Sequence, residues 1–220
     1  ILEHFDLKVS AGETIALVGA TGSGKTTIIN MLTRFYDVTE GSVTIDGTDV
    51  RDLDLGNLRR TVGVVMQDPF MFKGSVIDNI RYGRPDATDE ECIAAAKAIG
   101  ADAFIGKLSK GYETEFGEGG KGLSGGEKQL ISFARIILKD PKILVFDEAT
   151  SSVDSETEAM IQRSLEKIIE GRTAFFVAHR LSTIKKSNRI LYIGNKGILE
   201  EGSFAELMAK KGYFYSLENA

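Results

Sequence analysis

Short apolar runs recur near both ends of the chain, and they predict the strands of a sheet. The runs are residues 14–18, 62–66, 143–146 and 173–178. Continuous apolar runs of this length are typical of parallel strands that are buried on both faces. Residues 5–9 instead alternate apolar and polar side chains, which predicts a half-buried strand. A strand with a tight turn is expected over 41–47, and a strand pair over 189–193 and 198–201.

Helical spacing follows or separates these runs. The helices expected at 89–99, 125 to about 138 and 155–169 each begin at or directly after a Ser or Thr that is followed by Glu three residues later, a pattern that caps a helix at its first turn. The expected helices are residues 26–34, 89–99, 125 to about 138, 155–169 and 203–211. Strand–helix alternation at both ends, with mostly helical sequence between, predicts an α/β core and a helical subdomain. Within one domain of 1–220, the core would comprise about 1–74 and 139–220, and the helical subdomain about 75–138.

Composition narrows the class of protein. Hydrophobic residues make up 42% of the 220 residues, which is enough to bury a core. With 27 basic and 32 acidic residues the net charge is −5, which argues against nucleic acid as the main partner. The single cysteine, Cys92, excludes an intramolecular disulfide, fits a reducing compartment and is expected to be buried on helix 89–99. We expect the chain not to span a bilayer itself, and its start at Ile1 suggests a domain of a longer protein.

A glycine-rich loop between a predicted strand and a predicted helix carries the first chemical motif. Residues 19–26, GATGSGKT, match the pattern G-x-x-x-x-G-K-[ST]. In such a loop backbone N–H groups surround phosphate oxygens, and the following helix points its positive end at the same anion. Lys25 would reach the β- and γ-phosphates, and the Thr26 hydroxyl would hold Mg²⁺. The residues expected to bind nucleotide here are Gly19, Thr21, Gly22, Ser23, Gly24, Lys25 and Thr26.

Two adjacent carboxylates end the apolar strand 143–146. Asp147 is placed to hold Mg²⁺, directly or through water, as an acidic residue at the end of a buried strand can. Glu148, one residue further, could orient or deprotonate the attacking water. Carboxylates also end strands for purely structural reasons, but two after a wholly apolar strand in a chain with a phosphate loop favour catalysis.

A third motif, LSGGEKQ at 123–129, has two interpretations. Ser124 and Glu127 can form a capping box that needs no ligand. The paired glycines Gly125 and Gly126, however, cost stability at a helix start unless a phosphate approaches that terminus. Because one nucleotide rarely needs two such helix ends, we expect Ser124, Gly125, Gly126 and Glu127 to contact the nucleotide of a second copy.

Taken together and in this order, the motifs closely resemble those of the nucleotide-binding domain of ABC transporters of the exporter type, over essentially the whole chain. The resemblance implies an α/β P-loop NTPase core with a mixed sheet, an antiparallel β subdomain and an inserted helical subdomain. It identifies Thr27 as part of the phosphate loop and Glu148 as the catalytic carboxylate, and it places Glu127 where many members have glutamine.

Further roles come from the resemblance alone. Gln67 matches a Mg²⁺ ligand that also senses the membrane domain, Asp154 belongs to the D-loop at 151–154, and His179 matches a contact to the γ-phosphate. Ile1 matches an apolar residue beside the adenine, and the aromatic residue that stacks on adenine is expected before Ile1. Residues 114–120 resemble the exporter-specific X-loop, so the transmembrane domain, itself absent from this chain, is expected to contact the regions of Gln67 and Glu118 through its coupling helices.

The resemblance therefore implies an ATPase with Mg²⁺ as cofactor. Catalysis would rest on Lys25, Glu148 and His179 in a head-to-tail dimer with an identical or related domain, at the cytoplasmic face of a membrane. A DNA-repair ATPase would separate Lys25 from Ser124 by a long coiled coil, which the sequence lacks. A regulatory module without catalysis is disfavoured by the presence of Glu148 and His179. A GTPase is disfavoured because residues 195–198 lack the aspartate that recognises guanine.

Overall fold

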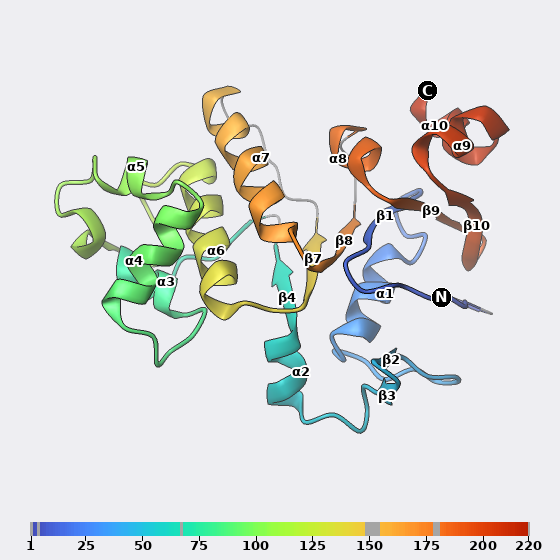
Figure 1. The fold of residues 1–220 in the computed structure, drawn as a ribbon, viewed down its shortest axis with the longest axis horizontal. Helices are drawn as coiled ribbons and strands as arrows, with labels where there is room; N and C mark the ends of the chain where they lie inside the picture. The colour runs from blue at the N-terminus through green and yellow to red at the C-terminus, as the bar shows by residue number, and fades with distance from the viewer. Residues whose placement is uncertain (1, 4, 67, 148–154, 178–180, 220) are drawn as a thin grey trace. The chain divides into compact units, whose positions relative to one another are not determined.

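The computed structural model describes residues 2, 3, 5–66, 68–147, 155–177 and 181–219, with the backbone alone at 155–157, 181 and 182 (Figure 1). Its contacts divide the chain into two units. The first comprises Ile1–Val64, Lys142–Glu148 and Gly171–Ala220. The second comprises Val65–Pro141 and Ala149–Glu170, so it takes in residues 65–74 and the helix at 155–169 as well as the predicted helical segment.

The first unit is built on a mixed sheet with strand order β10-β9-β1-β8-β7-β4. Its strands are β1 (Thr14–Val18), β4 (Val62–Val65), β7 (Ile143–Asp147), β8 (Thr173–Val177), β9 (Arg189–Gly194) and β10 (Gly197–Gly202). Strands β9, β1, β8 and β7 are parallel, and β10 pairs antiparallel with β9. The β9–β10 turn has positive φ at Asn195 (45°) and Lys196 (69°), the geometry that matches the twist of a tight hairpin.

Helices and a small hairpin complete the first unit. The hairpin turns at Asp46 and Gly47, both with positive φ. The elements are β2 (Thr44–Ile45), β3 (Thr48–Asp49), α1 (Lys25–Leu32), α2 (Leu55–Thr61), α8 (Leu181–Lys186), α9 (Phe204–Lys210) and α10 (Tyr213–Glu218).

The second unit is mostly helical. Helix α6 is central to it and packs against α3, α4 and α7. It also contains a short antiparallel pair formed by β5 and β6. The elements are β5 (Gly74–Ser75), α3 (Val76–Arg81), α4 (Asp89–Ala98), α5 (Asp102–Ile105), the 3₁₀ turn η1 (Gly111–Glu113), β6 (Glu115–Phe116), α6 (Gly125–Lys139) and α7 (Ser155–Ile169). Cys92 is fully buried on α4, and burial raises the pKa of its thiol.

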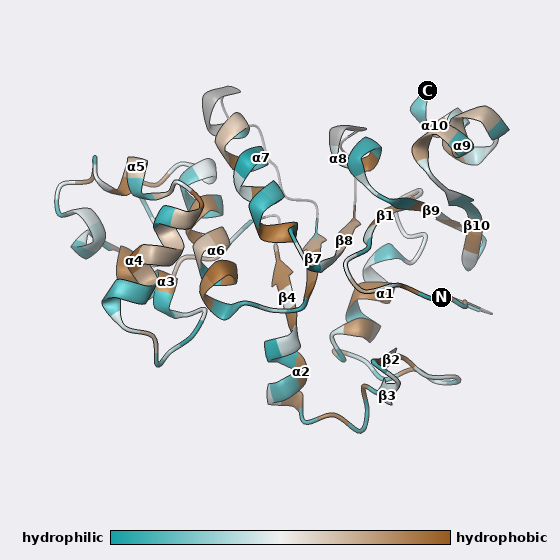
Figure 2. Ribbon diagram, viewed as in Figure 1, coloured by the Kyte–Doolittle hydropathy of each residue, from teal (hydrophilic) through white to brown (hydrophobic). Residues whose placement is uncertain are grey.

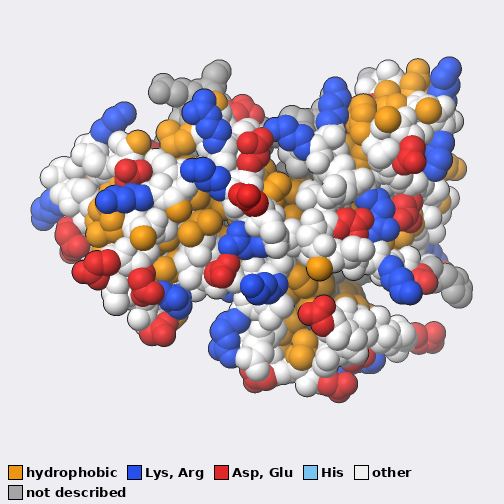
Figure 3. Space-filling model, viewed as in Figure 1, with side chains coloured by type: hydrophobic (Ala, Val, Ile, Leu, Met, Phe, Trp, Pro, Cys, Tyr) orange, Lys and Arg blue, Asp and Glu red, His pale blue; other side chains and the backbone are white. Residues whose placement is uncertain are grey.

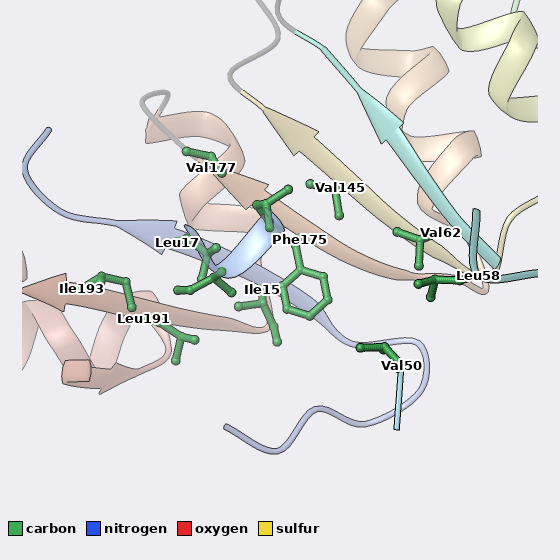
Figure 4. Packing of buried hydrophobic residues seen from close by; sticks show 12 residues of the cluster. Ile15, Leu17, Val50, Leu58, Val62, Val145, Phe175, Val177, Leu191 and Ile193 are labelled. Atoms are coloured by element: carbon green, nitrogen blue, oxygen red, sulfur yellow. The ribbon is translucent and has the colours of Figure 1, made fainter. Parts of the chain in front are cut away.

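The pleat of the sheet places the core of the first unit. Ile15 on β1 is in register with Phe175 on β8, which is in register with Val145 on β7, so all three side chains share a face (Figure 4). Ile28 and Ile29 of α1 belong to the same buried cluster, so α1 covers this face. On the opposite face Phe146 and Phe176 stack with ring centroids 4.6 Å apart. Burial on both faces explains why these strands are continuous apolar runs, which Figure 2 shows in brown.

Most of the predicted elements are confirmed, with boundaries that agree within two residues. The strand predicted at 5–9 is wrong, because none of these residues has strand pairing. Their alternation is nevertheless real: Phe5, Leu7 and Val9 are partly buried against the core cluster, while Asp6 and Lys8 are exposed. Helices α2, α8 and α10 were not predicted.

The surface on the face that Figure 3 shows carries basic and acidic side chains interspersed among the described residues. Neither sign gathers there into a single field of the kind that attracts nucleic acid. None of the helices in the described ranges combines the length and hydropathy that crossing a bilayer requires.

Leu17 tests the importance of the core beside the phosphate loop. It is fully buried on β1, so Leu17→Ala should lower the free energy of unfolding by about 2–5 kcal/mol, measured by urea denaturation. Leu217→Ala is the matched control, because Leu217 is 44% exposed on α10 and should change stability by less than about 0.5 kcal/mol. Equal effects of the two variants would contradict the assignment of the core.

Candidate functional site

The loop that follows β1 has a backbone that glycine alone can supply. Gly19, Gly22 and Gly24 have φ of 143°, 80° and 108°. A Cβ on Gly19 would lie 2.2 Å from the carbonyl oxygen of Ile193 on the neighbouring strand β9, which no side chain could tolerate. The tight loop therefore depends on the absence of side chains, and it leaves main-chain N–H groups able to approach an anion closely.

Lys25 is buried inside this loop. The residue is 6% exposed, and its Nζ donates to the carbonyl oxygens of Gly19 (2.7 Å) and Ala20 (2.9 Å). The ammonium thus donates to two carbonyl oxygens of its own loop at the start of α1. A buried ammonium at the start of a helix can bind an anion such as a phosphate.

The start of α1 also favours a negative charge at this position. Its N-cap is Gly24, which provides no side-chain cap, and no acidic residue lies in its first turn. The hydroxyl of Ser23 is buried and lacks a hydrogen-bond partner within the described ranges. A helix terminus without a capping side chain, a buried hydroxyl and a buried ammonium together form a cradle that fits a phosphate group.

Strand register brings a carboxylate to the same edge of the sheet. Leu17, Val177 and Asp147 are aligned across β1, β8 and β7, two strand spacings or about 10 Å from end to end. The alignment also puts the side chain of Asp147 on the face that α1 covers. Thr26, in the first turn of α1, is exposed. A hydroxyl and a carboxylate beside a phosphate cradle are oxygen donors of the kind that Mg²⁺ prefers, so these residues fit the ion.

In the second unit, the run Ser124–Glu127 forms the N-terminus of α6. Ser124 Oγ accepts from the Glu127 N–H (3.2 Å), and Glu127 Oε2 accepts from the Ser124 N–H (2.8 Å). The capping box predicted from the sequence is therefore formed. Ser124 and Gly125 are exposed, whereas Gly126 is buried. Glu118, in the same unit, is also exposed.

The structure brings together only part of the predicted site. The phosphate loop, Thr26 and Asp147 lie at one edge of the first unit, whereas Ser124–Glu127 belong to the second. Five predicted residues lie outside the described residues: Ile1, Gln67, Glu148, Asp154 and His179. The sequence did not indicate Ile193, whose carbonyl oxygen confines Gly19. Its contact arises from the pairing of β9 with β1, and no local pattern encodes it.

Comparison with known proteins identifies the family and the fold of this chain. The family model described as ABC transporter matches residues 2–151, and this chain belongs to that family. A solved structure described as a bacterial Atm1-family ABC exporter with ATP bound superposes with a TM-score of 0.92 and 42% identity, over 100% of this chain and 38% of that one. The α/β P-loop fold with a mixed sheet, small antiparallel sheets and a helical insertion is thereby confirmed.

Two curated relatives agree with this assignment. The ATP-dependent lipid A-core flippase of Desulfotalea psychrophila is 48% identical over 219 residues, and a putative multidrug export ATP-binding/permease protein of Staphylococcus aureus is 49% identical over 222 residues. Each match covers 100% of this chain and 38% of the relative. The chain is an ABC-transporter ATP-binding domain similar to those of exporters, and it spans little more than a third of the relatives' length.

Gly19 provides a direct test of the cradle. Gly19→Ala should weaken nucleotide binding by about tenfold or more, because the added methyl group must displace the main chain of β9 or of the loop. Affinity is measured with a fluorescent ATP analogue. Gly12→Ala is the control: Gly12 also has positive φ (79°), but a Cβ there meets nothing within 4 Å. It should lose some stability and keep its affinity, and a similar affinity loss in both variants would refute the steric argument.

Proposed function

We propose that this chain is the ATP-hydrolysing motor domain of an ABC exporter. The observation that carries the proposal is the cradle around Lys25, which lies at the same edge of the sheet as Asp147. Such an edge can hold the triphosphate and its metal together, and Glu148 directly follows Asp147 in the sequence. Membership of the ABC transporter family and the likeness to an exporter with ATP bound support the choice of ATP.

Each residue has a defined task in this mechanism. The N–H groups of residues 19–27 and the ammonium of Lys25 hold the β- and γ-phosphates, and Lys25 counters the charge that grows there during the reaction. Thr26, Asp147 and Gln67 would hold Mg²⁺, which when bound supplies further positive charge beside the β- and γ-phosphates. Glu148 orients the attacking water and accepts its proton, while His179 steadies the γ-phosphate.

A second domain completes the site. Helix α6 offers a second N-terminus, with exposed Ser124 and Gly125, in addition to that of α1. One triphosphate does not need both ends from one chain. We therefore assign Ser124–Glu127, together with Asp154, to the nucleotide of a partner domain, identical or related, in a head-to-tail dimer. Cleavage of the bond to the γ-phosphate removes the group that bridges the two domains, and the dimer loosens.

The motor would act on a transmembrane domain at the cytoplasmic face of the membrane. The regions around Gln67 and Glu118 are proposed to contact its coupling helices. The relatives' names, a lipid A-core flippase and a multidrug export protein, favour a transmembrane partner that moves lipid-like or drug-like molecules.

The dependence of ATPase activity on protein concentration tests the shared site. Specific activity of the chain should rise with concentration, because two domains must meet to complete each site. Glu148→Gln should reduce turnover by roughly two to four orders of magnitude, while the variant still dimerises in ATP and Mg²⁺ on size exclusion. Activity that neither dilution nor Glu148→Gln changes would contradict the mechanism.

Removal of the metal tests the role of Asp147. Chelation of Mg²⁺ should abolish hydrolysis, and Asp147→Asn should raise the Mg²⁺ concentration for half-maximal activity by about 10–100-fold. Asp52→Asn, which changes an exposed carboxylate of the same unit, should leave the Mg²⁺ requirement unchanged. An unaltered requirement in Asp147→Asn would remove this carboxylate from the metal site.

A further inference from the structure

Arg135, on α6, binds the main chain of the segment 70–72. Its Nη1 donates to the carbonyl oxygen of Phe70 (2.8 Å). Its Nε donates to the carbonyl oxygen of Asn79 (2.6 Å), and its Nη2 donates to Asn79 Oδ1 (2.7 Å). The guanidinium also lies over the ring of Phe72, 5.6 Å from its centroid. One side chain thus joins α6 to two other parts of the second unit.

Asn79 holds the same segment from the other side. It is fully buried on α3, its Oδ1 accepts from the Phe72 N–H (2.9 Å), and its Nδ2 donates to the carbonyl oxygens of Phe72 (3.0 Å) and Ser75 (2.9 Å). The main chain just after α3 also packs closely against α6, because a Cβ on Gly83 would lie 2.2 Å from the Arg135 carbonyl oxygen. The segment is therefore fixed at Phe70 by Arg135 and at Phe72 by Asn79.

The surroundings of Arg135 are unusual for a cation. Among the described residues, its hydrogen-bond acceptors are neutral carbonyl and amide oxygens, apart from a weak contact to the Met71 sulfur. Burial lowers the pKa of Arg135 to about 10, so the group stays charged near neutral pH. An apolar side chain could fill this space without burying a charge. What an apolar residue could not do is bind carbonyl oxygens at Phe70 and Asn79 simultaneously, as the planar guanidinium does.

The rings of Phe70 and Phe72 in this segment, together with Tyr82 just after α3, form an exposed aromatic edge. Phe70 is 51% exposed and Tyr82 is 57% exposed. Phe72 stacks on Tyr82 with centroids 3.8 Å apart and meets Phe70 edge-on at 5.1 Å. Ser124 caps the N-terminus of α6, the helix that carries Arg135. It lies 11 positions before Arg135, or about 16 Å along the helix at 1.5 Å per residue. The aromatic edge is thus connected to the run Ser124–Glu127 through the side chain of Arg135 and helix α6.

We infer that Arg135 is a positioning residue for the ATPase reaction: through Phe70 and Asn79 it locks the aromatic edge to α6, so that this edge and the run Ser124–Glu127 move as one body. The inference rests on the proposed function, because it gives the run a partner's nucleotide to contact. Loss of the lock should let the edge move without carrying α6. Nucleotide would still bind to the first unit of each chain. The partner's run Ser124–Glu127 would then reach that nucleotide less often.

The test compares Arg135→Met, Arg135→Lys and the control Lys97→Met, which removes an exposed cation from α4. It uses the complete native polypeptide, in nanodiscs where membrane helices accompany the chain. Turnover is expressed per nucleotide-binding molecule, so unfolded protein does not contribute. Arg135→Met should lower kcat by about tenfold, because the charge-assisted hydrogen bonds to Phe70 and Asn79 are lost, with KM for ATP changed less than about twofold. Arg135→Lys should recover part of this loss.

Amide hydrogen exchange provides the second measurement. The Phe72 N–H donates to Asn79, and the Gly119 N–H donates to the Met71 carbonyl oxygen (2.9 Å). Both should exchange about tenfold faster in Arg135→Met and at the normal rate in Lys97→Met. Normal exchange at Phe72, an unchanged kcat, a rise in KM alone, or an Arg135→Lys variant no better than Arg135→Met would each overturn the inference.

The two proposals can fail separately. If Glu148→Gln retains full activity, the proposed function fails, and the exchange rates at Phe72 and Gly119 still decide whether Arg135 holds the segment. If Glu148→Gln is inactive but Arg135→Met behaves as Lys97→Met does, the proposed function stands and the positioning role falls. Should Arg135→Met not fold, Arg135→Lys gives the same comparison, because it keeps the charge but lacks the planar fork that reaches both Phe70 and Asn79.

Discussion

The buried ammonium of Lys25 imposes the strictest physical demand on the first unit. A cation enclosed by protein needs partners that stabilise its charge, and two carbonyl oxygens of its own loop are among those of Lys25. Those carbonyls converge on Nζ because the loop turns tightly through residues with positive φ. The turn in turn depends on Gly19 passing close to the Ile193 carbonyl on β9. The position of the Lys25 ammonium therefore depends on the loop conformation, which in turn depends on the pairing of β1 with β9.

The sheet brings a carboxylate to the edge at which this loop lies. Parallel pairing ends β1, β8 and β7 at one edge, and the pleat turns Asp147 toward the face of α1. In the second unit, polar side chains instead fix the position of main-chain groups. Its polar contacts, from Asn79 and Arg135, fix a short loop segment to helices, while its α6 begins with a run that is itself closed by a capping box. The first unit thus positions the charge of Lys25, and the second unit positions the main chain of residues 70–72.

The sequence anticipates those features that are local. Apolar runs predict the strands because burial on both faces leaves no polar position, and Ser–Glu spacing predicts the start of α6 because the capping box lies within four residues. The alternation at 5–9 correctly indicates burial but wrongly indicates a strand, since alternation does not report hydrogen bonding. Ile193 and Arg135 act through contacts between distant segments. An arginine on the largely apolar face of α6 is a signal for the latter, although it does not reveal what the arginine binds.

The position of β1 in the sheet has a consequence for how the chain is made. β1 lies between β8 and β9, so the strand that leads into the phosphate loop emerges early in synthesis while its two neighbours emerge late. The cradle for the anion cannot close until most of the chain is available, and pairing between such distant segments is slow. Most of the second unit, Val65–Pro141, is contiguous and can acquire its local contacts sooner. The order of synthesis thus delays the anion cradle until late in folding, whereas much of the helical unit can form before it.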